Sequence, residues 1–416
     1  MITSRSACEE LDRSDSIAFA RDRFALPEGV IYLDGNSLGP LPKETAGRLA
    51  RTIEQEWGAG LIRSWNSADW INLPRRVGGR IAGLLGAGAD EVIAADSTSV
   101  NLFKLVSATL AAVSRNSPSR RVLLSEQGNF PTDLYVAQGV VRATGGQFEI
   151  KLVGAGEVEA ALAPDVALAV ITQVDYRTGR MHDMAELNAV ARRHGVVILW
   201  DLSHSAGAVP VELGRSGAQL AVGCGYKYFN GGPGAPAYLY VGKNLQQQLE
   251  SPLAGWFGHA VPFDFAATYT PAPGIDRFQC GTPSILAMQA LETGLQTFDG
   301  VAFADIRHKS LALSDLFWSL MDDHCGEFGF ECIAPRAHER RGSHLSFSHP
   351  QAYPIMQSLI DRGVIGDFRQ PDLIRFGFTP LYLRFADIWD AVMILRDVML
   401  TESWKSARFQ QRNAVT

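Results

Sequence analysis

The sequence predicts an α/β protein that has a large domain with a mostly parallel sheet and a smaller α+β domain. From Val122 to Val241, apolar runs alternate with segments of helical periodicity, a pattern typical of a parallel sheet with helices on both faces. The run Val196–Trp200 ends on Asp201, and an acid at the carboxyl end of a buried strand lies where such sheets bind ligands. From about residue 303 the pattern changes to a long amphipathic helix and short alternating strands. We expect an N-terminal segment (1–50) packing with the small domain, a large domain (51–302) and a small domain (303–416).

Composition narrows the class of protein. The 416 residues are 46% hydrophobic and 20% charged, as in ordinary globular proteins, and the formal net charge is −6. A chain without a basic field is not expected to bind nucleic acid or an anionic membrane. The five cysteines are widely spaced and form no Cys-x-x-Cys pair, which favours a reduced, cytoplasmic setting. We find no signal sequence and no run long enough to span a membrane.

The first third of the chain predicts helices joined by polar loops. We expect helices around Ser14–Phe24, Lys43–Trp57 and Trp70–Leu85, and a short strand at Val30–Leu33. In the loop after that strand, Asn36 and Ser37 stand between glycines, so the loop is either a plain connector or a close approach to a ligand. Trp65 lies in a polar loop, where packing explains it least.

Three successive hydroxyl residues, Ser97, Thr98 and Ser99, precede a helix in which apolar residues recur from Leu102 to Val113. One hydroxyl is enough to cap a helix. The free N–H groups of a helix N-terminus also form a natural phosphate site. The residues alone leave capping and phosphate binding both open.

The middle and end of the chain supply the remaining elements. Strands are expected at Val122–Ser125, Phe148–Val153, Val166–Thr172, Val196–Asp201, Ala235–Val241, His344–Phe347 and Leu373–Phe378. Helices are expected after Asn129–Asp133, near Glu157–Leu162, and at Met184–His194, Ser284–Phe298 and Ala386–Leu400.

Lys227 stands between Tyr226 and Tyr228, just before a glycine-rich run, with no acid beside it. Such a lysine is either a surface residue in a turn or an amine suited to Schiff-base chemistry. Pyridoxal phosphate requires an amine for its aldehyde and a carboxylate for its ring nitrogen. Lys227 and Asp201 would supply both.

Arg375 is flanked by apolar residues on a predicted strand. It either points to solvent from an exposed face or grips a substrate carboxylate with its two-pronged guanidinium.

Other chemistries have weaker support. Neither Asp201 with His204 nor His344 with His349 has a third ligand at a convincing spacing, so no metal is expected. Ser203 beside His204 lacks the Gly-x-Ser-x-Gly elbow of hydrolases. The glycines Gly83, Gly86 and Gly88 end a helix and do not form a dinucleotide fingerprint.

Several motifs together resemble the bacterial kynureninase family over nearly the whole chain. They are Leu33–Gly39 (LDGNSLG), Asn129–Asp133 (NFPTD), Trp200–Gly207 (WDLSHSAG), Gly225–Gly234 (GYKYFNGGPG) and Arg341–His344 (RGSH). The resemblance implies the pyridoxal-phosphate-dependent fold type I, whose large domain has a mostly parallel seven-stranded sheet. It also implies a homodimer with active sites at the interface. The implied reaction is hydrolysis of L-kynurenine to anthranilate and L-alanine, and acceptance of 3-hydroxykynurenine stays open.

The family's residue roles carry over by position. Lys227 would form the internal aldimine and later move the α-proton, and Asp201 would pair with the pyridinium nitrogen. Tyr226 is the candidate acid and base at the γ-carbonyl, after a quinonoid has formed and before the bond between the β and γ carbons is cleaved. The remaining cofactor residues would be Thr98, Ser99 and Tyr226 at the phosphate, Phe130 stacked on the ring, Asp133, Thr172 and His204 along it, and Trp256 and Thr282 from the neighbouring subunit. The substrate residues would be Arg375 at the α-carboxylate and Asn36 and Trp65 around the aryl ketone. Because Ser97, Thr98 and Ser99 are all hydroxyl residues, which of them touches the phosphate stays open.

Two alternatives share parts of this pattern. A cysteine desulfurase or selenocysteine lyase would require a mobile nucleophilic cysteine, whereas Cys325 and Cys332 lie among ordinary helix and strand residues. A cofactor-binding module of a regulator would require an attached DNA-binding domain, and no basic helix-turn-helix segment is present.

Overall fold

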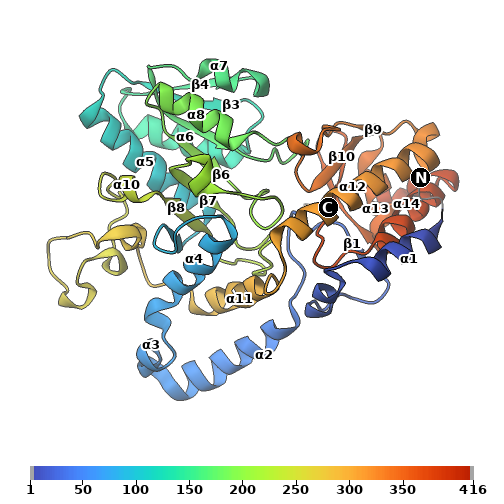
Figure 1. Ribbon diagram of the computed structural model, residues 1–416, viewed down its shortest axis with the longest axis horizontal. Coiled ribbons are helices and arrows are strands. Elements are labelled where there is room, and N and C mark those ends of the chain that lie inside the picture. Colours follow the sequence, from blue (N-terminus) through green and yellow to red (C-terminus); the bar gives the residue numbers. More distant parts are fainter. Residues whose placement is uncertain (1–3, 413–416) are drawn as a thin grey trace.

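A seven-stranded sheet forms the centre of the molecule in the computed structural model, which describes residues 4–412 (Figure 1). The strands lie in the order β2-β8-β7-β6-β5-β3-β4. They are β2 (Val92–Ala94), β3 (Val122–Glu126), β4 (Glu149–Val153), β5 (Val166–Thr172), β6 (Ile198–Asp201), β7 (Leu220–Gly223) and β8 (Tyr238–Val241). Only β8 runs against its neighbours, so the sheet is mostly parallel and the predicted α/β class is confirmed.

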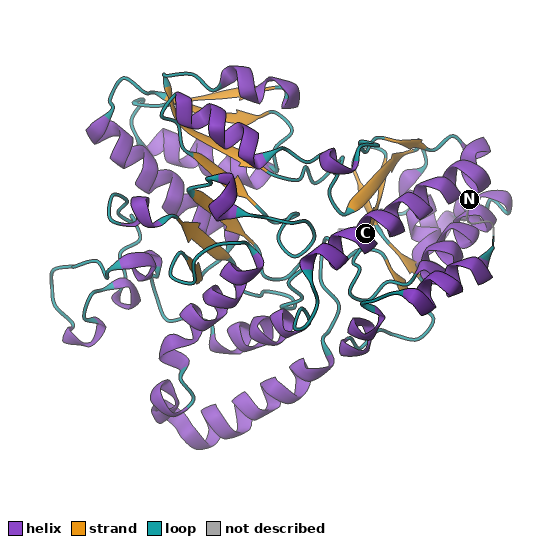
Figure 2. Ribbon diagram, viewed as in Figure 1, coloured by secondary structure: helices purple, strands orange, loops and turns teal. Residues whose placement is uncertain are grey.

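Helices cover both faces of this sheet (Figure 2). Its strands read as continuous apolar runs because both faces are buried, and alternate residues point to opposite sides. In β5, Leu168 and Val170 pack in one core cluster with residues of α5 and α6, while Ala169 and Ile171 pack in the other cluster with residues of α8. The helices of this part, the larger body (residues 64–296), are α3 (Ser64–Ser67), α4 (Leu73–Leu84), α5 (Thr98–Asn116), α6 (Pro131–Ala143), α7 (Val158–Ala161), α8 (Met184–Arg193), α9 (Leu213–Ser216), α10 (Lys243–Gln246) and α11 (Ile285–Gln296).

The smaller body combines residues 303–410 with residues 5–32. Its antiparallel sheet has the order β12-β13-β10-β9, and β1 pairs in parallel with β11. Its strands are β1 (Ile31–Tyr32), β9 (Glu331–Cys332), β10 (His344–Ser348), β11 (Val364–Ile365), β12 (Asp367–Arg369) and β13 (Leu373–Gly377). Its helices are α1 (Arg5–Ser14), α12 (Phe303–Cys325), α13 (Ala352–Asp361), α14 (Phe385–Leu400) and α15 (Ala407–Gln410).

Contacts of α1 explain why the first residues belong with the last. Asp12 accepts hydrogen bonds from the N–H groups of Phe385 (2.6 Å) and Ala386 (3.0 Å) at the start of α14. Arg5 donates from Nε to Asp390 Oδ1 at 2.8 Å. A carboxylate at a helix N-terminus satisfies free N–H groups and opposes the positive end of the helix dipole.

Several predicted elements differ from the structure. The helix expected at Ser14–Phe24 is wrong: α1 ends at Ser14, and only a 3₁₀ turn follows at Ala18–Arg23. The helix expected at Lys43–Trp57 begins as α2 (Lys43–Arg51) and widens into a π-helix over Thr52–Gly60. Strands β2, β7, β9, β11 and β12 and helix α13 were not predicted. Within residues 4–412, none of the helices combines the length and apolarity that crossing a membrane requires.

Candidate active site

A cavity of about 190 Å³ opens where β5 and β6 end. Thr172 and Asp201 are the last residues of these neighbouring parallel strands and are paired in register. The lining residues are Thr98, Ser99, Leu102, Phe130, Thr132, Asp133, Thr172, Tyr176, Asp201, Ser203, His204, Tyr226 and Lys227. The predicted cofactor residues, apart from Trp256 and Thr282, therefore come together here. A cavity of about 150 Å³ can hold a benzene ring, so there is space for a substituted aromatic ring.

Lys227 projects into this cavity from the loop that follows β7. Its Nζ lies 2.9 Å from Nε2 of His204, which is 4% exposed. The interpretation of Lys227 as a surface lysine in a turn is therefore wrong. The loop is also fixed from the other side, because Gly39 N–H donates to Tyr226 O at 2.8 Å and a Cβ on Gly39 would collide with the backbone of Lys227 and Asn230.

His204 is held in its neutral form. Burial, assisted by the charges of Lys227 and Arg375, lowers the pKa of His204 well below its usual value. If Nε2 of the neutral ring accepts from Lys227 Nζ, the ring carries its hydrogen on Nδ1. That Nδ1 is buried and has no hydrogen-bond partner within residues 4–412.

Two carboxyl groups share the cavity. Asp201 is 3% exposed and accepts from Ser203 N–H (2.8 Å) and Ser203 Oγ (2.6 Å). Burial, and next the charge of Asp201, raise the pKa of Asp133 well above its usual value, so Asp133 keeps its proton. The remaining negative charge lies on Asp201, where a cationic ring nitrogen would compensate it.

The start of α5 confirms capping by one of its hydroxyls, and phosphate binding by the others stays a prediction. Ser97 is the N-cap and accepts from Val100 N–H at 3.3 Å. Thr98 and Ser99 line the cavity instead. The same helix N-terminus is therefore capped by one hydroxyl and presents two more to the cavity, next to its free N–H groups.

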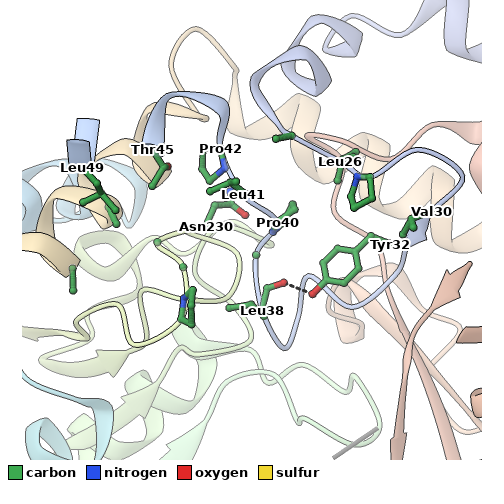
Figure 3. Close-up of a pocket in the computed structure, with 18 of the residues that line it drawn as sticks. Leu26, Val30, Tyr32, Leu38, Pro40, Leu41, Pro42, Thr45, Leu49 and Asn230 are labelled. Atoms are coloured by element: carbon green, nitrogen blue, oxygen red, sulfur yellow. Dashed lines mark hydrogen bonds between the residues drawn. The ribbon is translucent and has the colours of Figure 1, made fainter. Parts of the chain in front are cut away.

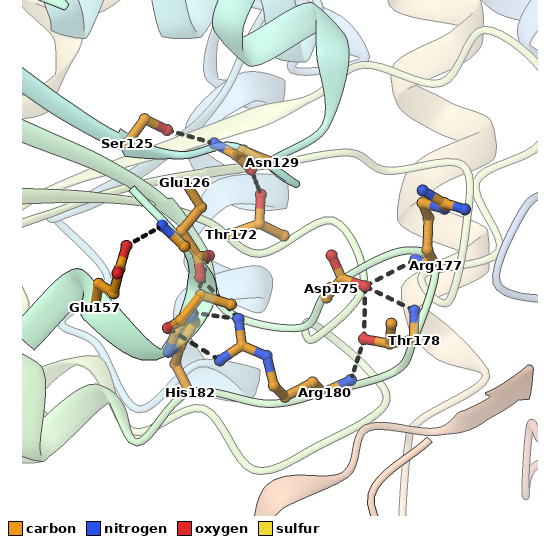
Figure 4. A network of polar contacts seen from close by, with 12 residues as sticks. Ser125, Glu126, Asn129, Glu157, Thr172, Asp175, Arg177, Thr178, Arg180 and His182 are labelled. Atoms are coloured by element: carbon orange, nitrogen blue, oxygen red, sulfur yellow. Dashed lines mark hydrogen bonds and ion pairs between the residues drawn. The ribbon is translucent and has the colours of Figure 1, made fainter. Parts of the chain in front are cut away.

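Asn129, bonded to Ser125 on one side and to Thr172 on the other (Figure 4), anchors the turn that carries Phe130. The Asn129 amide donates to Ser125 Oγ at 3.1 Å, and its oxygen accepts from Thr172 Oγ1 and from Phe130 N–H at 2.9 Å. These bonds tie the ends of β3 and β5 to the start of α6. Phe130 packs edge-on against Tyr176, with ring centroids 5.2 Å apart.

Arg375 is buried, at 1% exposure, so the interpretation of an exposed strand face is wrong. Its Nε donates to Asp367 Oδ1 (2.9 Å), and Nη2 donates to Asp367 Oδ2 and to Ser37 Oγ (2.9 Å). Nη1 donates to Tyr176 O at 2.5 Å. With its amide oxygen toward the guanidinium, Asn36 accepts from Nε at 3.0 Å. Arg375 thus joins the N-terminal loop to the loop after β5, beside the cavity.

Comparisons with known proteins agree with this geometry. Cysteine desulfurases from Thermococcus onnurineus and Escherichia coli superpose with TM-scores of 0.77 and 0.75 at 17% and 19% identity, covering 92% and 93% of this chain and 98% and 99% of theirs. At that identity they show the fold alone. Residues 306–395 match the family model of the kynureninase C-terminal domain. Kynureninase from Burkholderia mallei is 51% identical over 99% of this chain and 100% of its own length. Kynureninase from Pseudomonas fluorescens is 48% identical over the full length of both chains.

The chain belongs to the kynureninase family.

In this kynureninase-family chain, Trp65, Trp256 and Thr282 lie apart from the residues that line the cavity. Trp65 packs against Trp256 (ring centroids 6.2 Å apart) and Phe257 (6.0 Å). Phe257 N–H donates to Cys280 O at 3.1 Å, which joins this cluster to the exposed loop carrying Thr282. Trp65 and Trp256 are thus in contact and half-buried, and the exposed Thr282 follows two residues after Cys280.

Sequence reasoning missed Tyr176 and Asp367. Tyr176 lines the cavity and follows the end of β5 by four positions, so its place at the carboxyl edge of the sheet was a usable signal. Asp367 had no such signal, because its importance comes from pairing with Arg375 across β12 and β13.

Proposed function

We propose that this protein is a pyridoxal-phosphate-dependent hydrolase that converts L-kynurenine to anthranilate and L-alanine. Membership of the kynureninase family supports the reaction. The observation that carries the proposal is the convergence of the Lys227 amine, the Asp201 carboxylate and two hydroxyls of a helix N-terminus in one cavity. The cofactor would supply an aldehyde for the substrate amine and a ring that draws electrons away from the substrate's α-carbon.

The donor set fits that cofactor from end to end. Asp201 would keep the ring nitrogen protonated, and Phe130 would cover the ring. Thr98, Ser99 and Tyr226 would hold the phosphate with the N–H groups of α5. Asp133, Thr172 and His204 would line the ring.

The chain's own groups then move the protons. Lys227 Nζ takes the proton from the substrate α-carbon, next to neutral His204. Burial raises the pKa of Tyr226, so its hydroxyl keeps its proton at neutral pH and can donate it at the γ-carbonyl oxygen. Water adds to the γ-carbon, the bond between the β and γ carbons breaks, and anthranilate leaves with the new carboxyl group. Arg375 binds the α-carboxylate, and Asn36 borders it.

We also propose a homodimer whose partner completes each site with Trp256 and Thr282, while Trp65 shapes the substrate pocket. Exposed apolar residues support it: Trp57, Leu61 and Ile62 lie on one segment and Phe263 and Phe265 on another. An apolar pocket of about 600 Å³ adjoins the lysine loop and is lined by Leu26, Leu41, Leu49 and Asn230 among others (Figure 3). The five free cysteines favour the cytoplasm as the place of action.

The test combines cofactor absorbance with turnover. Purified protein should be yellow and should release fluorescent anthranilate from L-kynurenine. The variant Lys227→Ala should lose both signals, whereas Lys243→Ala, which removes an exposed lysine paired with Asp90, should keep them. A yellow protein that is inert toward kynurenine and 3-hydroxykynurenine would contradict the proposed substrate, but the assignment of the cofactor would stand. A release of sulfide from cysteine would instead favour the desulfurase alternative, although none of the described cavity-lining residues is a cysteine.

A further inference from the structure

Four charged side chains meet beside the cavity: Asp34, Asp367, Arg369 and Arg375. Asp367 is held by Arg375 through two parallel hydrogen bonds, and their side chains are 3% and 1% exposed. A guanidinium already paired in this way offers a substrate carboxylate little net positive charge. Its Nη2 and Nε also have protein acceptors, and one Nη1 hydrogen is taken by Tyr176 O.

Arg369 is the member of the cluster with spare capacity. It lies two residues after Asp367 on β12, so both side chains point to the same face of the sheet as Arg375. Its Nη2 donates to Asp367 Oδ2 at 2.7 Å and to Ser37 Oγ at 3.4 Å, whereas its Nη1 makes no hydrogen bond within residues 4–412. Its side chain is 38% exposed, whereas Arg375 and Asp367 are closed off.

Arg369 and Arg375 converge on one hydroxyl, because the Nη2 atoms of both donate to Ser37 Oγ, at 3.4 Å and 2.9 Å. The charge of Arg369 also helps to lower the pKa of His204 in the cavity wall, after burial and the charges of Lys227 and Arg375. The net charge of this four-residue cluster also favours the binding of an anion. Burial, and next the charge of Asp367, raise the pKa of Asp34 from 3.8 to about 7, so at neutral pH this acid is only partly ionised. The two arginines then outweigh the acids, and an anion can bind.

We propose that Arg369 is a second guanidinium that binds the substrate α-carboxylate together with Arg375, while Asp367 holds the two arginines side by side. The proposal rests on the proposed function, because it concerns the carboxylate of the same substrate. It predicts that selection for a substrate that bears an α-carboxylate depends on Arg369.

The experiment compares Arg369→Gln and Arg369→Lys with wild-type holoenzyme. Losing one charge-assisted contact should raise the KM for L-kynurenine about tenfold in Arg369→Gln and leave kcat within about threefold. The KM of Arg369→Lys should lie between those of wild type and Arg369→Gln. The inhibition constant of kynuramine, which lacks the α-carboxylate, should change less than about twofold in both variants.

Arg362→Gln is the matched control, because Arg362 is also 38% exposed but pairs with Asp397. Its KM should equal that of wild type, and thermal unfolding should show that all variants are folded. An unchanged KM in Arg369→Gln would overturn the inference, and so would an equal rise in the kynuramine constant, which would indicate general damage. Wild type that releases no anthranilate would instead show that the proposed function itself is wrong, and the inference with it.

Discussion

At the scale of single residues, burial decides which groups of the site carry charge. Desolvation favours neutral forms, and it acts on His204 and also on His344, whose pKa burial lowers from 6.5 to about 3. Two uncharged imidazoles therefore lie beside the amine of Lys227, with their ring centroids 5.5 Å apart. The positive charges near the cavity belong to Lys227 and the arginines, not to the two imidazoles. The chemistry at the α-carbon depends on this distribution of charge.

Asp34 gives a prediction about stability and pH. Its pKa is raised from 3.8 to about 7 in the folded chain, first by burial and next by Asp367. Protonated Asp34 therefore stabilises the native state fully below about pH 4, and this contribution is lost as the pH rises through 7. Relative to Asp34→Asn, the free energy of unfolding of wild type should fall by about 2 kcal/mol between about pH 5.5 and 8.5. Urea unfolding of both proteins measures it, and an equal pH dependence for the two would contradict the assignment.

At the scale of elements, the sequence predicts best where a single cause acts. The strand Val166–Thr172 is predicted to the residue, because both of its faces are buried and every position is apolar or small. Strands β2 and β7 are too short to stand out, and α1 has few apolar residues to reveal it, Ala7, Cys8 and Leu11, of which only Cys8 is buried. Residues such as Lys227 and Asp201 could also be found, because each stands in a short local motif. The burial of Arg375 could not, since Ser37 and Tyr176 reach it from distant segments and Asp367 from the paired strand β12.

The cap that α1 places on α14 predicts a measurable loss of stability. Asp12→Ala removes both acceptors from the Phe385 and Ala386 N–H groups and should cost about 1–2 kcal/mol of unfolding free energy. Glu10→Ala is the control, because Glu10 is 75% exposed and its ion pair with Arg13 is 3.8 Å long. Urea midpoints of the two variants should differ clearly. If they coincide, the cap does not hold the smaller body together.

At the scale of the whole molecule, the two groups of predicted site residues raise the question of shared active sites. Lys227 and Asp201 line one cavity, whereas Thr282 lies on an exposed loop apart from it. In a twofold dimer, a surface group on one subunit can complete the cavity of the other.

Mixing inactive variants distinguishes shared from separate sites. Lys227→Ala and Thr282→Glu, the latter placing a carboxylate against a phosphate, should each be inactive. Unfolding and refolding them together should restore about a quarter of the sites, because half of the dimers are hybrids with one intact site each. Lys227→Ala mixed with Asp201→Asn should restore nothing, since both defects belong to one cavity. If Thr282→Glu is active by itself and mixing it with Lys227→Ala adds no activity, Thr282 lies outside the site.

The pairing of β1 with β11 and of α1 with α14 has a consequence for biosynthesis. Residues 5–32 leave the ribosome long before their partners, Val364–Ile365 and Phe385–Leu400, are translated. The larger body has all its strands once Val241 has emerged, and it can fold while translation continues. The opening segment must wait, unpaired, for almost the entire chain. Arg375, which donates to Ser37 Oγ and Tyr176 O beside the cavity, is also made late, so the site is completed only near the end of synthesis.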